Sequence, residues 1–283
     1  MKTIVVTRPV GQARQLIEML QLGLDKERQL CPEKSAEVKI LSLPLLTIIP
    51  KGEEGDGQHS DPLADHIATL LQDADLVIFV SPNAIECTMR LLGRDWQDFS
   101  KRIIPIGVMG GSSKLALKHH GIGLEASPTE FFLPDSPERW DSEGLWETLQ
   151  ALNWDWSKRK IVIFKGEGGR DWLADTLKAA GARVEAISVY ARVPLSLDSP
   201  AWQGVWEMNI AQSLWLLTSS EAVRYLGKVI QERPQLDLLA ASAICPHQQI
   251  GEAAKAIGFG KVFICEPGDQ SLVNAAQVWV SLN

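Results

Sequence analysis

The chain has 283 residues, of which 45% are hydrophobic and 22% are charged, and its formal net charge is −7. This length is typical of two domains of roughly 100–150 residues each, and no apolar run approaches the roughly 20 residues of a membrane helix. The acidic balance argues against nucleic acid as a partner, because nucleic-acid-binding surfaces are basic. A polyanionic ligand would have to be held by local donors, since the net charge repels it.

The N-terminal residues and the cysteines favour a cytoplasmic protein. The opening MKTIVVTRP has an apolar run of only about four residues, far shorter than the roughly 7–15 residues of a signal peptide core. Four cysteines lie far apart without a C-x-x-C pair, which indicates free buried thiols: Cys31, Cys87, Cys245 and Cys265. The histidines lack ligand spacing, so we expect neither a metal site nor a cofactor.

The elements predicted along the chain alternate between strands and amphipathic helices. Apolar runs predict strands at residues 3–7, 37–41, 45–49, 76–80, 103–107, near 124, and at 160–164, 183–186, 187–193, 213–217, 241–244 and 262–265. Amphipathic stretches predict helices at residues 12–22, 62–72, 84–92, 112–120, 142–152, 173–180, 221–230, 249–257 and from about 270. Loops are expected at residues 23–36, 51–61 and 127–141. This alternation predicts parallel sheets with right-handed crossovers.

Two stretches of the chain are similar in sequence. VIFVSPNAI at 77–85 resembles LWLLTSSEAV at 214–223. The repetition predicts an α/β fold of two similar lobes, each a parallel sheet flanked by helices (flavodoxin-like), with the second lobe inserted into the first. The expected bounds are 1–42 and 198–283 for the first lobe, 62–186 for the inserted lobe, and 43–61 and 187–197 for linker strands and a loop.

Candidate binding residues follow the predicted strands. Ligands of open parallel sheets bind beyond the carboxyl ends of the strands, where turns lead into helices. If the lobes face each other, these turns line one cleft, and the candidates are Arg8, Ser81, Asn83, Gly110, Thr218, Ser219 and His247. Ser81, Asn83 and Ser219 are also residue types that cap helices, so capping is the alternative at any single turn. His247 is a proton carrier or, alternatively, a cap or surface residue.

The stretch IVIFKGEGGRDWL at 161–173 combines a strand, a glycine-rich turn and a helix start. The turn holds Gly166, Gly168, Gly169 and two flanking cations, Lys165 and Arg170. Such a turn exposes backbone N–H groups at the positive end of a helix, where anions bind. Its spacing matches neither the phosphate loop nor the G-x-G-x-x-G motif. Alternatively, the glycines serve only the positive φ of the turn.

Several motifs along the chain resemble those of uroporphyrinogen-III synthases. In order they are VTRP, FVSPNAI, SEGL at 142–145, FKGEGGRDWL, SVY at 188–190 and LTSSEAV. The resemblance covers essentially the whole chain, and it implies two lobes joined by a two-stranded antiparallel linker. It further implies a monomeric cytoplasmic lyase of haem, chlorophyll and sirohaem biosynthesis, without a cofactor. Such an enzyme cyclises hydroxymethylbilane to uroporphyrinogen III, losing water and inverting the last pyrrole ring.

The resemblance also assigns roles to individual residues. It implies cleft-facing positions at Ser81, Gly107, 166–170, Tyr190 and Ser219. Tyr190 would be the family's mobile tyrosine, a candidate proton donor to the departing hydroxyl, whereas from the sequence alone it could equally pack between the lobes. Lys165 and Arg170 become candidate partners for substrate carboxylates, unless Glu167 and Asp171 neutralise them and the backbone amides bind instead.

The chain departs from the family pattern at two turns. Relatives often carry hydroxyl residues where this chain has 108–111 and His247 with Gln248. A mechanism that relies on a threonine hydroxyl at those turns is therefore not expected. These departures are the main support for the alternative hypothesis, a non-catalytic two-lobed ligand-binding or sensor protein derived from this fold.

Overall fold

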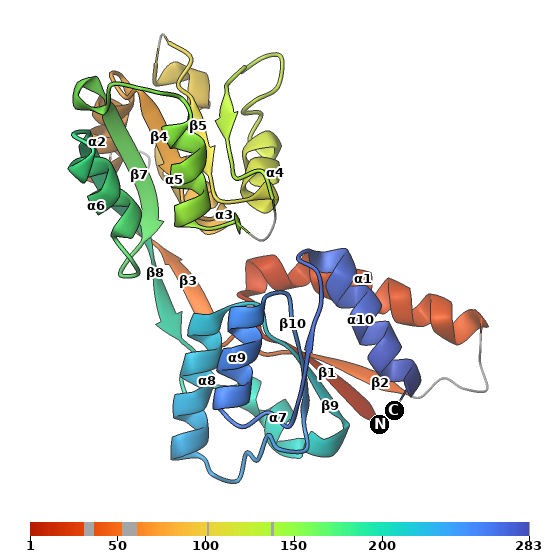
Figure 1. The fold of residues 1–283 in the computed structure, drawn as a ribbon. Coiled ribbons are helices and arrows are strands. Elements are labelled where there is room, and N and C mark those ends of the chain that lie inside the picture. The colour runs from red at the N-terminus through yellow and green to blue at the C-terminus, as the bar shows by residue number, and fades with distance from the viewer. Residues whose placement is uncertain (31–36, 53–60, 101, 137–138, 283) are drawn as a thin grey trace. The chain divides into compact units, whose positions relative to one another are not determined.

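The computed structural model describes residues 1–30, 37–52, 61–100, 102–136 and 139–282. The chain forms two compact units (Figure 1): one comprises Met1–Thr47 and Val193–Asn283, and the other Ile48–Arg192. The second unit is therefore inserted into the first in sequence. Cys31 and most of the predicted loop 51–61 lie outside the described residues.

In the described part of the first unit, five parallel strands form one sheet in the order β11-β10-β9-β1-β2. The strands are β1 (Lys2–Val6), β2 (Val38–Ser42), β9 (Ser213–Leu216), β10 (Ser242–Cys245) and β11 (Lys261–Ile264). The three central strands are almost entirely buried because helices cover both faces of the sheet.

The helices of the first unit form two layers around this sheet (Figure 1). On one face α1 (Val10–Leu30) packs against α10 (Asp269–Leu282), and their apolar residues share a core with Ile4 and Leu216. On the other face lie α7 (Gln203–Glu207), α8 (Ser220–Glu232) and α9 (Gln248–Ala256), packed around Trp215. The turn Pro200–Trp202 contributes its indole to this second core.

The second unit, as far as it is described, contains a six-stranded sheet in the order β3-β8-β7-β4-β5-β6. The strands are β3 (Leu46–Pro50), β4 (Leu76–Phe79), β5 (Ile106–Val108), β6 (Phe131–Phe132), β7 (Lys160–Gly166) and β8 (Arg183–Pro194). Strands β4 to β8 pair in parallel. The Lys51 amide donates to the Val189 carbonyl at 2.8 Å and the Leu195 amide to the Leu45 carbonyl at 3.0 Å, so β3 and β8 run antiparallel.

Helices also cover both faces of the second sheet (Figure 1). One face carries α2 (Pro62–Leu71), α3 (Pro82–Leu92) and α4 (Gly111–His119) over a core that includes Phe79 and Phe164. The other carries α5 (Ser142–Gln150) and α6 (Trp172–Ala179) over Ile78 and Ile163. Opposite faces of the same strands therefore belong to two separate cores.

The two units repeat one arrangement with a circular permutation. The order β6-β5-β4-β7-β8 in the second unit corresponds to β11-β10-β9-β1-β2 in the first. In the second unit the chain forms these strands consecutively from β4 to β8. In the first unit the chain begins with β1, the counterpart of β7, and forms the counterparts of β4, β5 and β6 last. The predicted class, α/β with similar parallel sheets flanked by helices, is confirmed.

Several elements differ from the prediction, among them α7, which no predicted helix covers. Strand β8 is one strand of 12 residues, Arg183–Pro194, rather than two separate strands. Strand β6 lies inside the predicted loop 127–141, and near residue 124 there is only an isolated bridge between Leu124 and Ser127. Helix α1 continues to Leu30 through part of the predicted loop 23–36, because the charged residues there are also good helix formers. No helix in the described parts of the chain is both long and apolar enough to span a membrane.

The buried thiols lead to a first prediction. Burial raises the pKa of Cys87 to about 11 and that of Cys245 to about 12, so neither forms the reactive thiolate at neutral pH. Burial also raises the pKa of Cys265, but its side chain is partly exposed. In a Cys31→Ser background, a thiol reagent at pH 8 should therefore label Cys265 slowly and should reach the other two cysteines only after denaturation. Labelling of Cys87 or Cys245 in the native protein would contradict their burial.

Candidate active site

The predicted site residues gather at one kind of position in each unit. In the second unit β4 and β7 are neighbours, but α3 and α6, which follow them, lie on opposite faces of the sheet. In the first unit the same reversal occurs between β9 and β1. The carboxyl ends of such strands are where open α/β sheets bind ligands. Ser81 and the turn 165–170 follow β4 and β7, while Thr218 and Arg8 follow β9 and β1.

Tyr190 is the centre of a polar cluster in the second unit. Its side chain is fully buried beside an apolar core, and its hydroxyl lies 3.1 Å from Ser81 Oγ. Arg192 Nη2 donates a hydrogen bond to Tyr190 Oη at 2.8 Å, and the guanidinium carbon lies 5.1 Å from the ring centroid. The structure thus brings together two predicted residues, Ser81 and Tyr190. It adds Arg192, which the sequence analysis missed.

A bulge in β8 positions this tyrosine. Opposite β7, Lys165 pairs with Ser188 and Gly166 pairs with Tyr190, so that Val189 is an extra residue. Val189 and Tyr190 consequently both face the core, although side chains normally alternate along a strand. The Glu167 amide donates to the Tyr190 carbonyl at 2.7 Å and holds the strand in this register. Beyond the bulge the alternation of side chains resumes, so Arg192 shares a face of the strand with Tyr190. The spacing of two residues between them could have indicated from the sequence that Arg192 lies beside Tyr190.

The glycines of the turn have different roles. A Cβ at Gly166 would lie 2.7 Å from Tyr190 Cε2 and Cζ, so this position must be glycine for the ring to approach β7. Gly168 and Gly169 have φ of 69° and 83°, and no described atom would lie within 4 Å of a Cβ at either position. They provide the left-handed turn and leave its backbone open. Gly166 therefore makes room for the tyrosine, and the other two expose amides.

The cations beside this turn already have acidic partners. Lys165 is paired with Asp171 and Arg170 with Glu143, and Lys51 Nζ lies 3.1 Å from Glu167 Oε2. A hydrogen bond from Lys165 and its charge lower the pKa of Asp171. The geometry favours the alternative in which local acids neutralise the cations. In that alternative the backbone amides face the ligand.

The helix starts around the second sheet differ in capping. Ser81 caps α3 by accepting from the Ala84 amide at 3.2 Å, and Asn83 lies half-buried in the first turn of that helix. Within the described residues, the side chain of Asp171 before α6 makes no capping bond, and Gly110 before α4 has no side chain that could make one. The first-turn amides of α4 and α6 are therefore not satisfied by their own N-cap side chains.

Two of the predicted glycines serve packing. A Cβ at Gly110 would lie 2.8 Å from Trp140 Cδ2, because the indole covers the start of α4. A Cβ at Gly107 would lie 3.2 Å from Ile78 Cγ1, since Gly107 is buried within β5. Both glycines allow close contact with an apolar side chain, which by itself explains their presence.

In the first unit, Arg8 contacts two residues at strand and helix ends. Arg8 Nη1 lies 2.6 Å from Asp269 Oδ1 at the start of α10, and Arg8 Nε donates to Thr218 Oγ1 at 3.3 Å. Ser219 caps α8 through the Ala222 amide at 3.3 Å, as the capping alternative predicts. His247 is exposed at the start of α9 and makes no side-chain capping bond to the described chain. Thus Arg8 and Thr218 are brought together, and Asp269 was missed by the sequence analysis.

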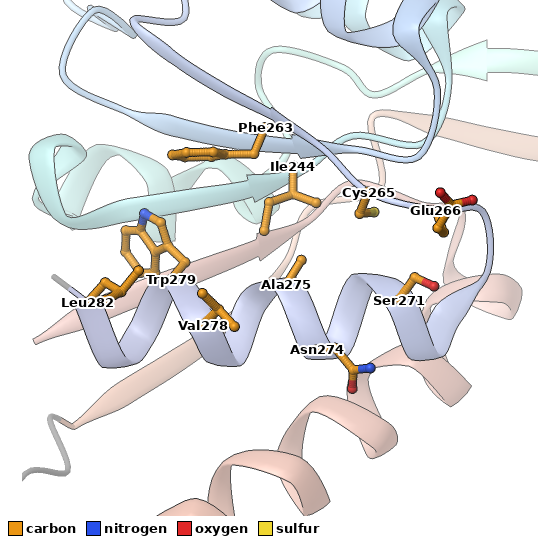
Figure 2. A pocket seen from close by; sticks show the side chains of 10 residues that line it. All are labelled: Ile244, Phe263, Cys265, Glu266, Ser271, Asn274, Ala275, Val278, Trp279 and Leu282. Carbon is orange, nitrogen blue, oxygen red and sulfur yellow. The ribbon is translucent and has the colours of Figure 1, made fainter.

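The first unit also has an apolar groove of ≈ 430 Å³ (Figure 2). Phe263 of β11 and Ile244 of β10 face Trp279 and Val278 of α10 across it. Its described lining includes none of the predicted site residues. Within the described residues there is also no group of three or more His, Cys, Asp or Glu placed to hold a metal ion.

Comparison with known proteins establishes the family. A family model described as uroporphyrinogen-III synthase HemD matches residues 27–274. The chain belongs to the uroporphyrinogen-III synthase family. Its members are lyases of porphyrin biosynthesis, and membership favours the enzyme hypothesis over the sensor hypothesis.

Individual family members are distant in sequence but similar in length and fold. The uroporphyrinogen-III synthase of Escherichia coli is 25% identical over 233 residues, covering 81% of this chain and 88% of its own. The enzyme of Salmonella typhimurium is 25% identical over 225 residues, covering 78% and 85%. A crystal structure of a mutant Thermus thermophilus synthase gives a TM-score of 0.59 at 14% identity, covering 99% of this chain and 98% of its own. The crystal structure of the Helicobacter pylori enzyme gives a TM-score of 0.55 at 14% identity, covering 99% of this chain and 100% of its own. At such low identity these two structures support the fold alone.

The Gly166–Tyr190 contact leads to a second prediction for this family member. Gly166→Ala should lower the free energy of unfolding by about 2 kcal/mol, because the new Cβ displaces the tyrosine ring. Gly93→Ala is the matched control: Gly93 ends α3 with φ of 58° and no described atom near its Cβ position. It should cost about 1 kcal/mol, from backbone strain alone. Chemical denaturation measures both, and equal losses would contradict the steric role of Gly166.

The Lys165–Asp171 pair leads to a third prediction. Because the folded-state pKa of Asp171 is lowered, the pair stabilises the fold above the ordinary carboxyl pKa. That stabilisation is lost as pH falls through the lowered value. Lys165→Met should raise the pKa of Asp171, as followed by carboxyl NMR. Lys158→Met is the control. Hydrogen bonds from Ser157 and Lys158 lower the pKa of Asp155 to about 2, so this substitution should raise the pKa of Asp155 and leave that of Asp171 unchanged. An unchanged Asp171 pKa in Lys165→Met would contradict the pairing.

Proposed function

We propose that the chain cyclises the linear tetrapyrrole hydroxymethylbilane to uroporphyrinogen III, with loss of water and inversion of the last pyrrole ring. The observation that carries this proposal is the family match over residues 27–274. The Ser81–Tyr190 contact at the switch point of the second unit supplies a polar group suited to the first chemical step. A cytoplasmic location and a monomeric state remain predictions.

The substrate supplies most of its own reactivity. Loss of hydroxide from hydroxymethylbilane is assisted by the pyrrole nitrogen and gives an azafulvene cation, which ring carbons attack readily. Spontaneous closure gives the uninverted isomer. The enzyme must therefore direct attack to the substituted carbon of the last ring, so that a spiro intermediate forms and fragments. Its main contribution is geometric control, which can be worth several powers of ten in rate.

Backbone amides are suited to hold the substrate's acetate and propionate groups. The amides of Gly168 and Gly169 lie in an exposed turn, and the first turn of α6 follows directly. The exposed N–H groups of the turn and the positive dipole end of the helix both favour carboxylates. Because Lys165 and Arg170 are already paired with acids, we assign carboxylate binding mainly to these amides. In the first unit Thr218 is the corresponding candidate, whereas Arg8 is already paired with Asp269.

The departing hydroxyl requires a proton, and Tyr190 is placed to supply it through Ser81. The phenol ring is fully buried, whereas Ser81 is only half-buried, so Ser81 is the group that contacts the substrate. The Ser81 hydroxyl protonates the leaving hydroxide, and the Tyr190 hydroxyl replaces that proton. Water leaves, and the proton released when the last ring regains aromaticity restores the phenol. Such proton donation typically contributes about 10²–10⁴-fold.

Isomer analysis tests the function directly. Hydroxymethylbilane generated enzymatically just before use is given to the chain, and the products are oxidised and separated. The type III isomer should dominate, whereas the uncatalysed reaction gives type I. Type I alone would overturn the proposal and favour a non-catalytic ligand-binding protein.

The role of Tyr190 leads to a fourth prediction. Tyr190→Phe should lower kcat by about 100-fold with KM nearly unchanged, because it removes the proton donor and keeps the ring. The chain has two tyrosines, and Tyr225 is the matched control. Its hydroxyl donates to the Leu195 carbonyl in the first unit, so Tyr225→Phe should retain full turnover. Full turnover in Tyr190→Phe would eliminate Tyr190 as the donor.

A further inference from the structure

Arg192 contacts the phenol of Tyr190 in two ways. Its Nη2 donates to the phenol oxygen at 2.8 Å, and its guanidinium carbon lies 5.1 Å from the ring centroid. Both contacts follow from the spacing of two residues along β8, which places the side chains on one face beyond the bulge. Arg192 is half-buried and belongs to the same unit as Tyr190 and Ser81.

The contact restricts the direction of the phenol proton. A guanidinium has donors but no acceptor, so the Tyr190 O–H cannot point towards Arg192. The described oxygen within hydrogen-bonding distance of the phenol is Ser81 Oγ, at 3.1 Å. With Arg192 donating from one side, the phenol proton is directed towards Ser81. The three residues therefore form an ordered chain of donors from Arg192 through Tyr190 to Ser81.

The charge of Arg192 suits the state that follows proton transfer. When the phenol oxygen gives up its proton, negative charge develops 2.8 Å from a fixed cation. Donors that are already in place when such charge develops lower the barrier without reorganisation. A planar guanidinium can hold the oxygen and cover the ring at the same time, whereas the point charge of lysine cannot.

We propose that Arg192 is a positioning residue for Tyr190. It orients the phenol proton towards Ser81 and stabilises the phenol oxygen during transfer, without contacting the substrate. This inference rests on the proposed synthase function. A purely structural arginine would change stability but not kcat alone, and a substrate-binding arginine would change KM.

A kinetic double-mutant cycle tests the proposal. Arg192→Met should lower kcat for type III formation by about tenfold, the usual effect of one charged hydrogen bond, with KM within about twofold of wild type. In a Tyr190→Phe background the same substitution should cause no further loss, because the group it acts on is absent. Arg192→Lys should recover part of kcat, since it keeps a cationic donor. Arg183→Met, at the exposed start of the same strand, is the control and should retain wild-type kinetics.

Two kinetic outcomes would overturn the proposal. Equal losses from Arg192→Met in the wild-type and Tyr190→Phe backgrounds would show that Arg192 acts independently of the phenol. A raised KM with unchanged kcat would show that it binds the substrate directly. The wild type, Arg192→Met, Tyr190→Phe and the double variant are also compared by chemical denaturation without substrate. If the phenol and the guanidinium are in contact, the losses in free energy of unfolding should not add up in the double variant. Additive losses would overturn the proposal. Failure of the proposed function is a separate result, namely that the wild-type chain forms only the type I isomer.

Discussion

A phenol buried against an apolar core must keep its hydroxyl hydrogen-bonded, and this requirement organises the site in the second unit. Leaving such a group unsatisfied costs about 1–3 kcal/mol. Tyr190 meets the requirement through Ser81 and Arg192. Gly166 leaves space for the ring, and the bulge at Val189 turns the ring to the core side. The same contacts that stabilise the tyrosine also leave its proton directed at Ser81, which caps α3 and reaches the surface.

The distribution of charge suggests how an acidic protein handles a substrate with many carboxylates. With a net charge of −7, long-range attraction cannot bring such a substrate in. The cations nearest the glycine-rich turn are neutralised by Asp171 and Glu143. Amides at helix starts and in the turn at Gly168 carry fixed partial charges and require no counter-ion. They suit a flexible ligand because they fix the positions of carboxylates without adding net charge.

The sequence predicted the strands, helices and turns of both sheets closely, because periodic apolar patterns and glycine-rich turns are local signals. It missed β6, which has only two residues, Phe131 and Phe132, and depends on pairing with β5. It divided β8 into two strands because that long strand pairs with β7 along one part and β3 along another. The local sequence also gave no sign that Ile78 and Trp140 lie against Gly107 and Gly110, whose role as ligand contacts stays a prediction.

The sequence alone determined the α/β class, the repeat of one sheet arrangement and the positions of the turns that follow β4, β7, β9 and β1. These properties depend on neighbours within a few residues. Only the tertiary structure decided that Tyr190 is buried, that Arg192 donates to its hydroxyl, and that the cations at 165 and 170 are paired. Each of these depends on a register between strands or on a contact across elements. A single-residue bulge shifts such a register and leaves no clear trace in the local sequence.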